Sequence, residues 1–198
     1  EAALSAEDPA GVDDAVAAAV AAAPEEVAAA LDVTLAADWS FEQGPPAPEA
    51  VAAYGEVVGW LGENCGFGTL DLVASEYAFG GLPTEVAAGP TIVSLTNEGE
   101  ELHEVIFIRK NDDVTESFAE LLELPEEEAL TMASIVSMTL TLPGETGHAV
   151  VDLAPGDYLA ICFRPTGLTP DLLELPDATD PAGPPHFVHG MMQEFTVG

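Results

Sequence analysis

The sequence predicts a mainly β protein, an antiparallel Greek-key β-sandwich that follows a helical N-terminal region. Residues 1–62 contain no Lys, Arg or His and are rich in alanine, which favours helix. From Thr69 onward, short runs of β-branched and aromatic residues alternate with turns that contain Gly or Pro, a pattern typical of sandwiches. A length of 198 residues allows one domain with an appended region. We expect a helical region at 1–64 and the sandwich at 65–198.

The N-terminal region is expected to form several helices. Residues 13–23 are alanine-rich, and Pro24 followed by two glutamates suits a helix start, where a missing N–H and negative charge are both favourable. Apolar residues then recur every four positions up to Leu35, on one helical face. A Pro-rich break at 44–48 precedes a further helix at 49–61. We interpret the region as a small helical layer or arm; the alternative is a docking surface for a partner.

The second region is expected to contain strands joined by tight turns. Its turn signals are the Gly-, Pro- or Asn-containing stretches 80–83, 97–101, 143–147 and 154–157. The strands predicted between them are 70–79, 91–96, 103–108, 132–142, 148–153, 158–162 and 193–197. A short helix at 117–124 and a long loop at 164–185, rich in Pro and Asp, complete the prediction.

The charge of the chain excludes several classes of function. Its net charge is −33, from 36 acidic and 3 basic residues, and such a field repels nucleic acids and anionic membrane surfaces. A hydrophobic content of 48% argues against disorder, yet no apolar run is long enough to span a membrane. An acidic surface suits high salt or low pH. Because the chain also begins at Glu1 without an initiator Met, we expect an extracytoplasmic protein, secreted, periplasmic or at the cell surface, in a high-salt or acidic environment.

Four residues of the second region carry side chains that bind soft metal ions. Cys162 closes the predicted strand 158–162, His186 and Met191 lie five positions apart before the last strand, and His103 opens the strand 103–108. Two imidazoles, one thiolate and a weak axial thioether are the ligands of blue-copper electron-transfer sites. His189 is an alternative to His186, since both precede Gly190 closely.

These motifs and their order resemble the cupredoxin family, the small blue-copper proteins of plastocyanin and azurin type, over residues of about 69–198. Ala78-Phe79 with Ala88-Gly89 looks like the entry hairpin, and 155–162 looks like the family's turn, tyrosine and thiolate strand. Phe195 to Val197 resembles the closing strand. The resemblance implies a cupredoxin-like fold with copper bound by His103, Cys162, His186 and Met191. It also implies an exported electron carrier that is not an enzyme and that meets a redox partner protein or another extracytoplasmic protein.

The sequence departs from the family pattern at two places. Residues 163–185 separate the thiol from the second imidazole, which in the family usually lie only a few residues apart. Glu104 follows the first imidazole, where the family commonly has an Asn whose amide steadies the ligand loop. An insertion of this length does not forbid a site, because the entropy cost of loop closure grows slowly with length.

Two other functions stay open at this level. Two cysteines in an exported chain could form a Cys65–Cys162 disulfide, which would make the fold a metal-free interaction or structural module. A copper carrier that uses only His and Met is the third possibility. Signatures of zinc proteases, of serine hydrolases and of phosphate-binding loops are lacking in the sequence.

Overall fold

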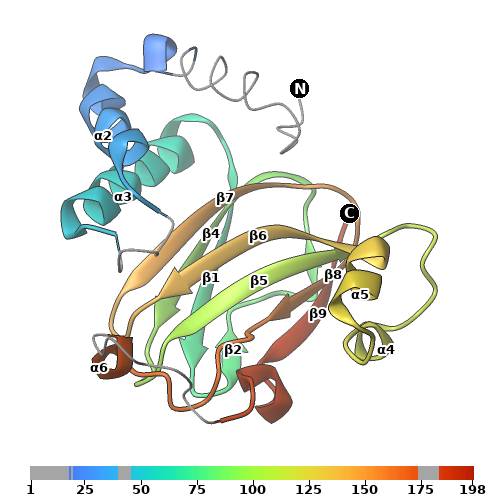
Figure 1. The fold of residues 1–198 in the computed structure, drawn as a ribbon. Coiled ribbons are helices and arrows are strands. Elements are labelled where there is room, and N and C mark those ends of the chain that lie inside the picture. Colours follow the sequence, from blue (N-terminus) through green and yellow to red (C-terminus); the bar gives the residue numbers. More distant parts are fainter. Residues whose placement is uncertain (1–17, 19, 40–45, 174–182) are drawn as a thin grey trace. The chain divides into compact units, whose positions relative to one another are not determined.

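The computed structural model describes residues 18, 20–39, 46–173 and 183–198, and its chain forms two compact units, Glu1–Cys65 and Gly66–Gly198 (Figure 1). The first unit contains helices α2 (Glu25–Ala36) and α3 (Pro48–Asn64), which pack against each other. The Trp60 indole N–H donates a hydrogen bond of 3.0 Å to Glu26. Both predicted helices are therefore present; of the stretch 13–23, residues 18 and 20–22 are helical, Ala23 is not, and residues 13–17 and 19 lie outside the described residues.

The second unit is a sandwich of two β-sheets. Its strands are β1 (Gly68–Ser75), β2 (Ala78–Gly80), β3 (Glu85–Val86), β4 (Gly89–Asn97), β5 (His103–Lys110), β6 (Ala133–Thr141), β7 (Thr146–Leu153), β8 (Gly156–Ile161) and β9 (Met192–Val197). Its short helices are α4 (Phe118–Leu121), α5 (Glu126–Met132), α6 (Pro170–Leu173) and the 3₁₀ turn η1 (His186–His189).

The two sheets have the orders β2-β1-β4-β7 and β3-β9-β8-β5-β6 (Figure 1). The connections cross between the sheets, so the fold is the expected cupredoxin-like β-sandwich. Most pairings are antiparallel, but β1 runs parallel to β4 and β3 parallel to β9. The sheets are thus mixed where the sequence suggested purely antiparallel ones, because β1 and β4 are joined through other elements and not by a hairpin.

The register brings the start of β5, the end of β8 and the start of β9 to one end of the sandwich. β8 is antiparallel to both neighbours, with Ile161 opposite Ile106 of β5 and opposite Met192 of β9. His103 begins β5 and Cys162 follows β8 directly. β1 and β4 are parallel, so the turns that follow them also lie at a common end, and β4 leads into β5. We call this end of the molecule the site end.

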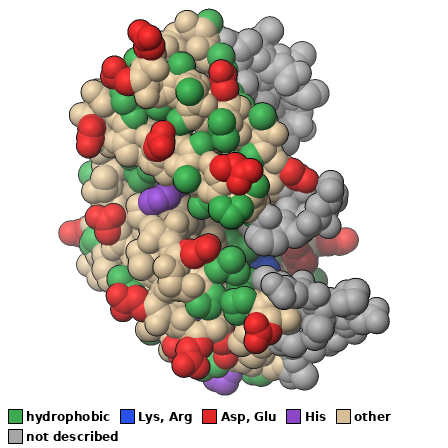
Figure 2. Space-filling view, turned by 90° about the vertical axis from the view of Figure 1, so that its left-hand side faces the viewer, with side chains coloured by type: hydrophobic (Ala, Val, Ile, Leu, Met, Phe, Trp, Pro, Cys, Tyr) green, Lys and Arg blue, Asp and Glu red, His purple; other side chains and the backbone are tan. Residues whose placement is uncertain are grey.

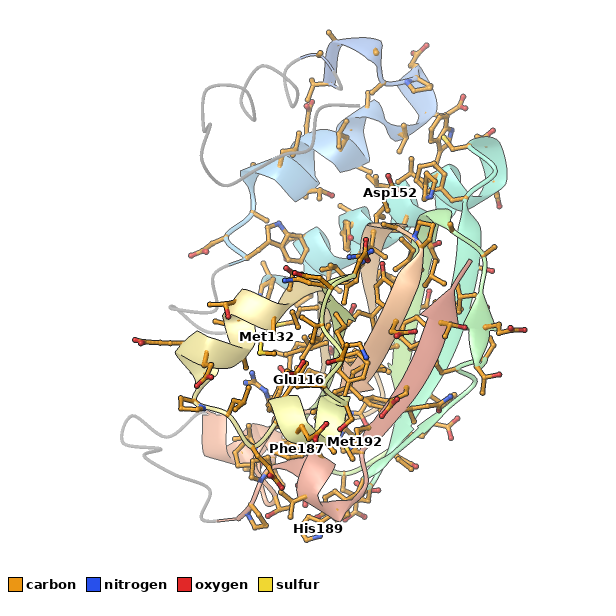
Figure 3. All side chains as sticks on the ribbon, turned by 90° about the vertical axis from the view of Figure 1, so that its right-hand side faces the viewer. Glu116, Met132, Asp152, Phe187, His189 and Met192 are labelled. Carbon is orange, nitrogen blue, oxygen red and sulfur yellow. The ribbon has the colours of Figure 1, made fainter. Side chains whose placement is uncertain are left out.

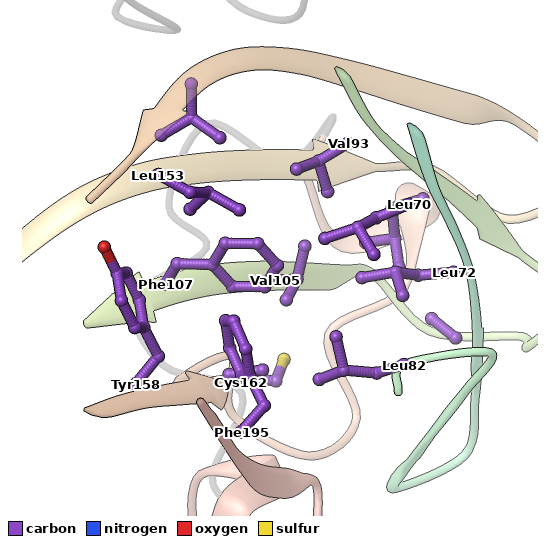
Figure 4. Packing of buried hydrophobic residues seen from close by; sticks show 14 of the residues in the cluster. Leu70, Leu72, Leu82, Val93, Val105, Phe107, Leu153, Tyr158, Cys162 and Phe195 are labelled. Atoms are coloured by element: carbon purple, nitrogen blue, oxygen red, sulfur yellow. The ribbon is translucent and has the colours of Figure 1, made fainter. Parts of the chain in front are cut away.

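The main core lies between the sheets and extends to the site end. Phe107, Tyr158 and Phe195 stack within it, and Cys162 and Met191 are fully buried members of the same cluster (Figure 4). Side chains alternate along a strand, so His103 shares the inner face of β5 with Val105 and Phe107. The outer face of β5 carries Glu104 and Ile106 and is covered by a second apolar cluster, which includes Phe118 and Leu121 of α4.

Two elements differ from the sequence prediction. The run 70–79 is broken by a two-residue turn at Glu76-Tyr77, which joins β1 to β2. Helix α5 was not predicted, although Pro125 and the three glutamates at 126–128 form a favourable helix start. Neither α2 nor any other helix of the described chain is long and apolar enough to cross a membrane. Acidic side chains are spread over the face seen in Figure 2, as a net charge of −33 requires.

Candidate metal centre

Three of the four predicted ligands converge at the site end. Nδ1 of His186 lies 3.1 Å from Nδ1 of His103 and 3.4 Å from Sγ of Cys162. One donor atom from each of the three residues lies within 4.8 Å of the other two, and all three side chains have 0% exposure. Residues that are up to 83 positions apart in sequence thus form one buried cluster.

Burial opposes charge on these side chains. It lowers the pKa of His103 to about 4, with a further contribution from the neighbouring His186. It raises the pKa of Cys162 to about 11, although hydrogen bonds from the backbone N–H groups of Glu104 and Arg164 act in the opposite direction. At neutral pH and without an ion, His103 is neutral and Cys162 is a thiol. The two N–H donors are already placed to stabilise a thiolate if the proton leaves.

Met191 is held beside this cluster by its backbone. Its N–H donates to the carbonyl of His186 at 3.2 Å, and its carbonyl accepts from the N–H of Cys162 at 3.1 Å. The Met191 side chain is fully buried in the main apolar core, which also contains Cys162. His189, the alternative ligand, is exposed at the end of η1 (Figure 3) and is not part of the His-Cys-His cluster; its ring lies against Tyr77, with 4.8 Å between the ring centroids.

The long insertion between Cys162 and His186 is closed at its base. The N–H of His186 donates to the carbonyl of Arg164 at 2.8 Å, and the N–H of Thr166 donates to that of Pro184 at 3.0 Å. Pro165 and Pro185 form an antiparallel bridge. A Cβ added to Gly183 would collide with the Thr166 side chain, so the close approach of the two arms requires glycine there. The base therefore presents His186 to Cys162 much as a short loop would.

Glu104, which follows His103, binds the backbone of the residue after Cys162. Its Oε1 accepts a hydrogen bond of 3.1 Å from the N–H of Phe163, the residue after Cys162. Its Oε2 lies 2.7 Å from Nη2 of Arg164 without the angle of a hydrogen bond, so this contact is an ion pair. The side chain of Glu104 is only 1% exposed. The strand of one candidate ligand is thus tied to the strand of another.

Three further residues at the site, which the sequence did not single out, contact the imidazoles from outside. Glu101 Oε2 lies 3.0 Å from Nε2 of His186, and Glu76 Oε1 lies 4.0 Å from Nε2 of His103. The ring of Tyr77 meets His186 edge-on at 5.0 Å, and its hydroxyl donates to Glu101 Oε1 at 3.2 Å. The left-handed backbone of Tyr77 (φ 63°) has no sequence signal, since it usually requires Gly or Asn.

The disulfide alternative is not confirmed by this structure. Both cysteines are unpaired: Cys65 is exposed, and Cys162 is buried with its sulfur against His186.

The cluster fits a soft metal ion. The two Nδ1 atoms are 3.1 Å apart, so without an ion they must share a proton to avoid repulsion between their lone pairs. If His103 supplies that proton, its buried Nε2 is a bare acceptor, and it has no hydrogen-bond partner among the described residues. An ion at the inner nitrogens would remove this conflict and put the proton on Nε2. One thiol and two imidazoles suit copper ions.

No protein-family model and no curated protein matches the sequence. Among solved structures, the fold is similar to dithionite-reduced auracyanin of Roseiflexus castenholzii, with 20% identity, a TM-score of 0.40 and coverage of 66% of this chain and 96% of that one. Auracyanin B is similar with 22% identity, a TM-score of 0.38 and coverage of 66% and 88%. A multi-copper oxidase of Pediococcus acidilactici shows 14% identity, a TM-score of 0.37 and coverage of 69% and 27%. What the present chain does is inferred below from its own residues.

Proposed function

We propose that the chain is a copper protein that carries single electrons, with His103, Cys162, His186 and Met191 as ligands. The observation that carries this proposal is the convergence of one sulfur and two ring nitrogens, fully buried and within 4.8 Å of one another. A copper ion held there would supply a couple between Cu(I) and Cu(II), for which thiolate, thioether and imidazole are suitable donors.

The protein's own part is to hold these donors still and keep water away. Cys162 is fixed by its place after β8 and by the bond from its N–H to Met191. His186 is fixed by the closed base of the insertion, and His103 by the β5 ladder. Donors that cannot move favour rapid electron transfer, because little reorganisation accompanies the change of charge.

The test is addition of Cu(II) to the full, reduced chain. An intense thiolate-to-copper absorption near roughly 600 nm is expected at one equivalent. Cys162→Ser should abolish the band, whereas Cys65→Ser should keep it and serves as the matched control. A chain that stays colourless, or a band that survives Cys162→Ser, would overturn the proposal. An electron carrier should also be reduced and reoxidised reversibly. In the presence of phenols or metal ions it should consume no dioxygen, whereas an oxidase would consume it.

The setting we propose is extracytoplasmic, with a protein as the redox partner. The support is the acidic composition, 36 acidic residues against 3 basic ones, which suits an acidic or salt-rich medium. Fractionation of cells of the source organism, with detection by antibody, tests this location. Recovery with the cytosolic fraction would contradict it.

A further inference from the structure

Each imidazole of the candidate metal centre has a carboxylate near its outer nitrogen, Nε2. His186 has 0% exposure, and its Nε2 is bonded to Glu101 at 3.0 Å. His103 is equally buried, and its Nε2 faces Glu76 at 4.0 Å. A carboxylate on the outer nitrogen of a metal-binding histidine fixes which nitrogen is protonated and makes the ligand more basic.

Glu101 is itself held by several donors. Its Oε2 accepts from the N–H of Gly167 at 2.7 Å as well as from His186, and its Oε1 accepts from the Tyr77 hydroxyl at 3.2 Å. The turn that carries Glu101 is secured by Asn97, whose buried amide donates to the Glu101 carbonyl at 2.8 Å and accepts from Gly99 at 2.8 Å. Such a carboxylate cannot turn away from His186 without breaking several bonds.

Glu76 is held near His103 by the turn between β4 and β5. Its carboxylate accepts a hydrogen bond from the backbone N–H of Glu100. Gly99 lies between Glu76 and His103: an added Cβ would stand 2.5 Å from Glu76 Oε1 and 2.8 Å from His103 Nε2. Only glycine at this position leaves room for the carboxylate to lie 4.0 Å from the imidazole nitrogen.

We propose that Glu101, bonded to Nε2 of His186, and Glu76, which faces Nε2 of His103, are positioning residues that direct both inner nitrogens to the metal and favour Cu(II) over Cu(I). This inference rests on the proposed function for its copper part, but not for the protonation of His186. The two carboxylates lower the reduction potential because negative charge on the imidazoles stabilises the more highly charged ion. Glu101 and Tyr77 both lie against His186, which has 0% exposure, so electrons reach the site through the side chains that cover this imidazole.

The first experiment needs no metal. Long-range ¹H–¹⁵N spectra of the metal-free full chain report which nitrogen of each histidine bears a proton. His186 is expected as the Nε2–H form, and Glu101→Ala should convert it to a mixture of forms. A wild-type His186 protonated only at Nδ1 overturns the inference.

The second experiment measures the copper-loaded chain. Glu101→Gln should weaken Cu(II) binding by about 10-fold and change Cu(I) binding less, as is typical for loss of an outer partner. If Glu101→Gln weakens only the binding of Cu(II), the midpoint potential rises by about 59 mV for each tenfold loss of Cu(II) affinity, the constant for a one-electron couple. Glu76→Gln should raise it in the same direction but by less, because the contact to His103 is longer. Redox titration of the absorption band measures both.

The matched control is Glu98→Gln. Glu98 is an exposed glutamate of the same turn, and this substitution removes one negative charge without touching an imidazole. A shift in Glu98→Gln as large as that in Glu101→Gln would show a general charge effect and overturn the inference. If copper binds with its band and Glu101→Gln leaves the potential unchanged, the inference fails and the proposed function stands. If His186 is Nε2–H but copper does not bind, the proposed function fails and the positioning of His186 stands.

Discussion

Arg164 and Glu104 form an ion pair in which one side chain is buried and the other is partly exposed. Because of this difference, we expect replacement of Arg164 and replacement of Glu104 to change the free energy of unfolding by unequal amounts. The Glu104 side chain is 1% exposed and that of Arg164 is 36% exposed. Removing Arg164 leaves a buried carboxylate without its countercharge, whereas removing the charge of Glu104 leaves a guanidinium that can turn to water. We therefore expect Arg164→Met, which keeps an apolar stem, to be much more destabilising than Glu104→Gln.

The magnitudes follow from the contacts. Arg164→Met leaves the charge of Glu104 buried and unpaired, which should lower the free energy of unfolding by about 3 kcal/mol. This value is at the lower end of the usual range for buried ion pairs, because Arg164 is partly exposed. Glu104→Gln keeps an acceptor for the Phe163 N–H and loses about 1 kcal/mol, the charged part of that bond. The double variant should lose only about 1–2 kcal/mol, so the coupling between the two sites is about 2–3 kcal/mol.

The assay is urea unfolding of the metal-free full chain. Both tryptophans, Trp39 and Trp60, belong to the N-terminal unit, so their fluorescence reports on that unit; the sandwich must be followed by circular dichroism or by NMR. Asp112→Asn is the control, because Asp112 is 83% exposed in its pair with Arg109 and should contribute less than about 1 kcal/mol. Equal losses for Arg164→Met and Glu104→Gln, or additive losses in the double variant, would refute the reasoning from burial.

Three other predictions concern the metal-free chain. A thiol reagent should label Cys65 at once, because Cys65 is exposed, and should label Cys162 only at the rate of unfolding, because Cys162 has 0% exposure. The absorbance of the dye that the reagent releases measures both rates. Two thiols that react fast, or none, would contradict this prediction. The pKa of His103 is lowered to about 4, so unfolding takes up a proton between that pH and its ordinary 6.5. Stability should therefore fall by up to about 3 kcal/mol as the pH drops through this window, and His103→Gln should lack this part of the slope in urea titrations. Gly183→Val should separate Pro184 from Thr166 and loosen the base of the insertion, seen as faster amide exchange at Thr166 with the strands unchanged.

Much of the sandwich could be predicted because its strands end at residues with strong local preferences. The turns at 143–147 and 154–157 contain Pro-Gly pairs, and the strands on either side of each begin and end within a few residues of the prediction. The approach of Cys162, His186 and His103 was expected from the resemblance of their motifs to the cupredoxin pattern, whereas the residues alone left a disulfide open. Whether these residues bind copper is a prediction that the copper titration tests.

Contacts that depend on tertiary structure could not be predicted. The bonds that close the insertion, such as Thr166 to Pro184, join residues whose sequence reads as an ordinary Pro-rich loop. The ion pair of Glu104 with Arg164 required knowing that β5 lies beside β8. Glu101 reads as one of three glutamates in an acidic turn, and only the fold shows that its carboxylate meets His186.

The two-residue turn at Glu76-Tyr77 links these observations. Hairpins of this length favour Asn-Gly, because left-handed backbone is costly for most side chains, on the order of 1–3 kcal/mol. Here Tyr77 adopts φ 63° instead, and both side chains of the turn are used: Glu76 faces His103, and Tyr77 contacts His186 and bonds Glu101. A turn chosen only for stability would carry glycine at position 77. The strained tyrosine is therefore explained by the site it covers, and this is independent support for a function at that end of the sandwich.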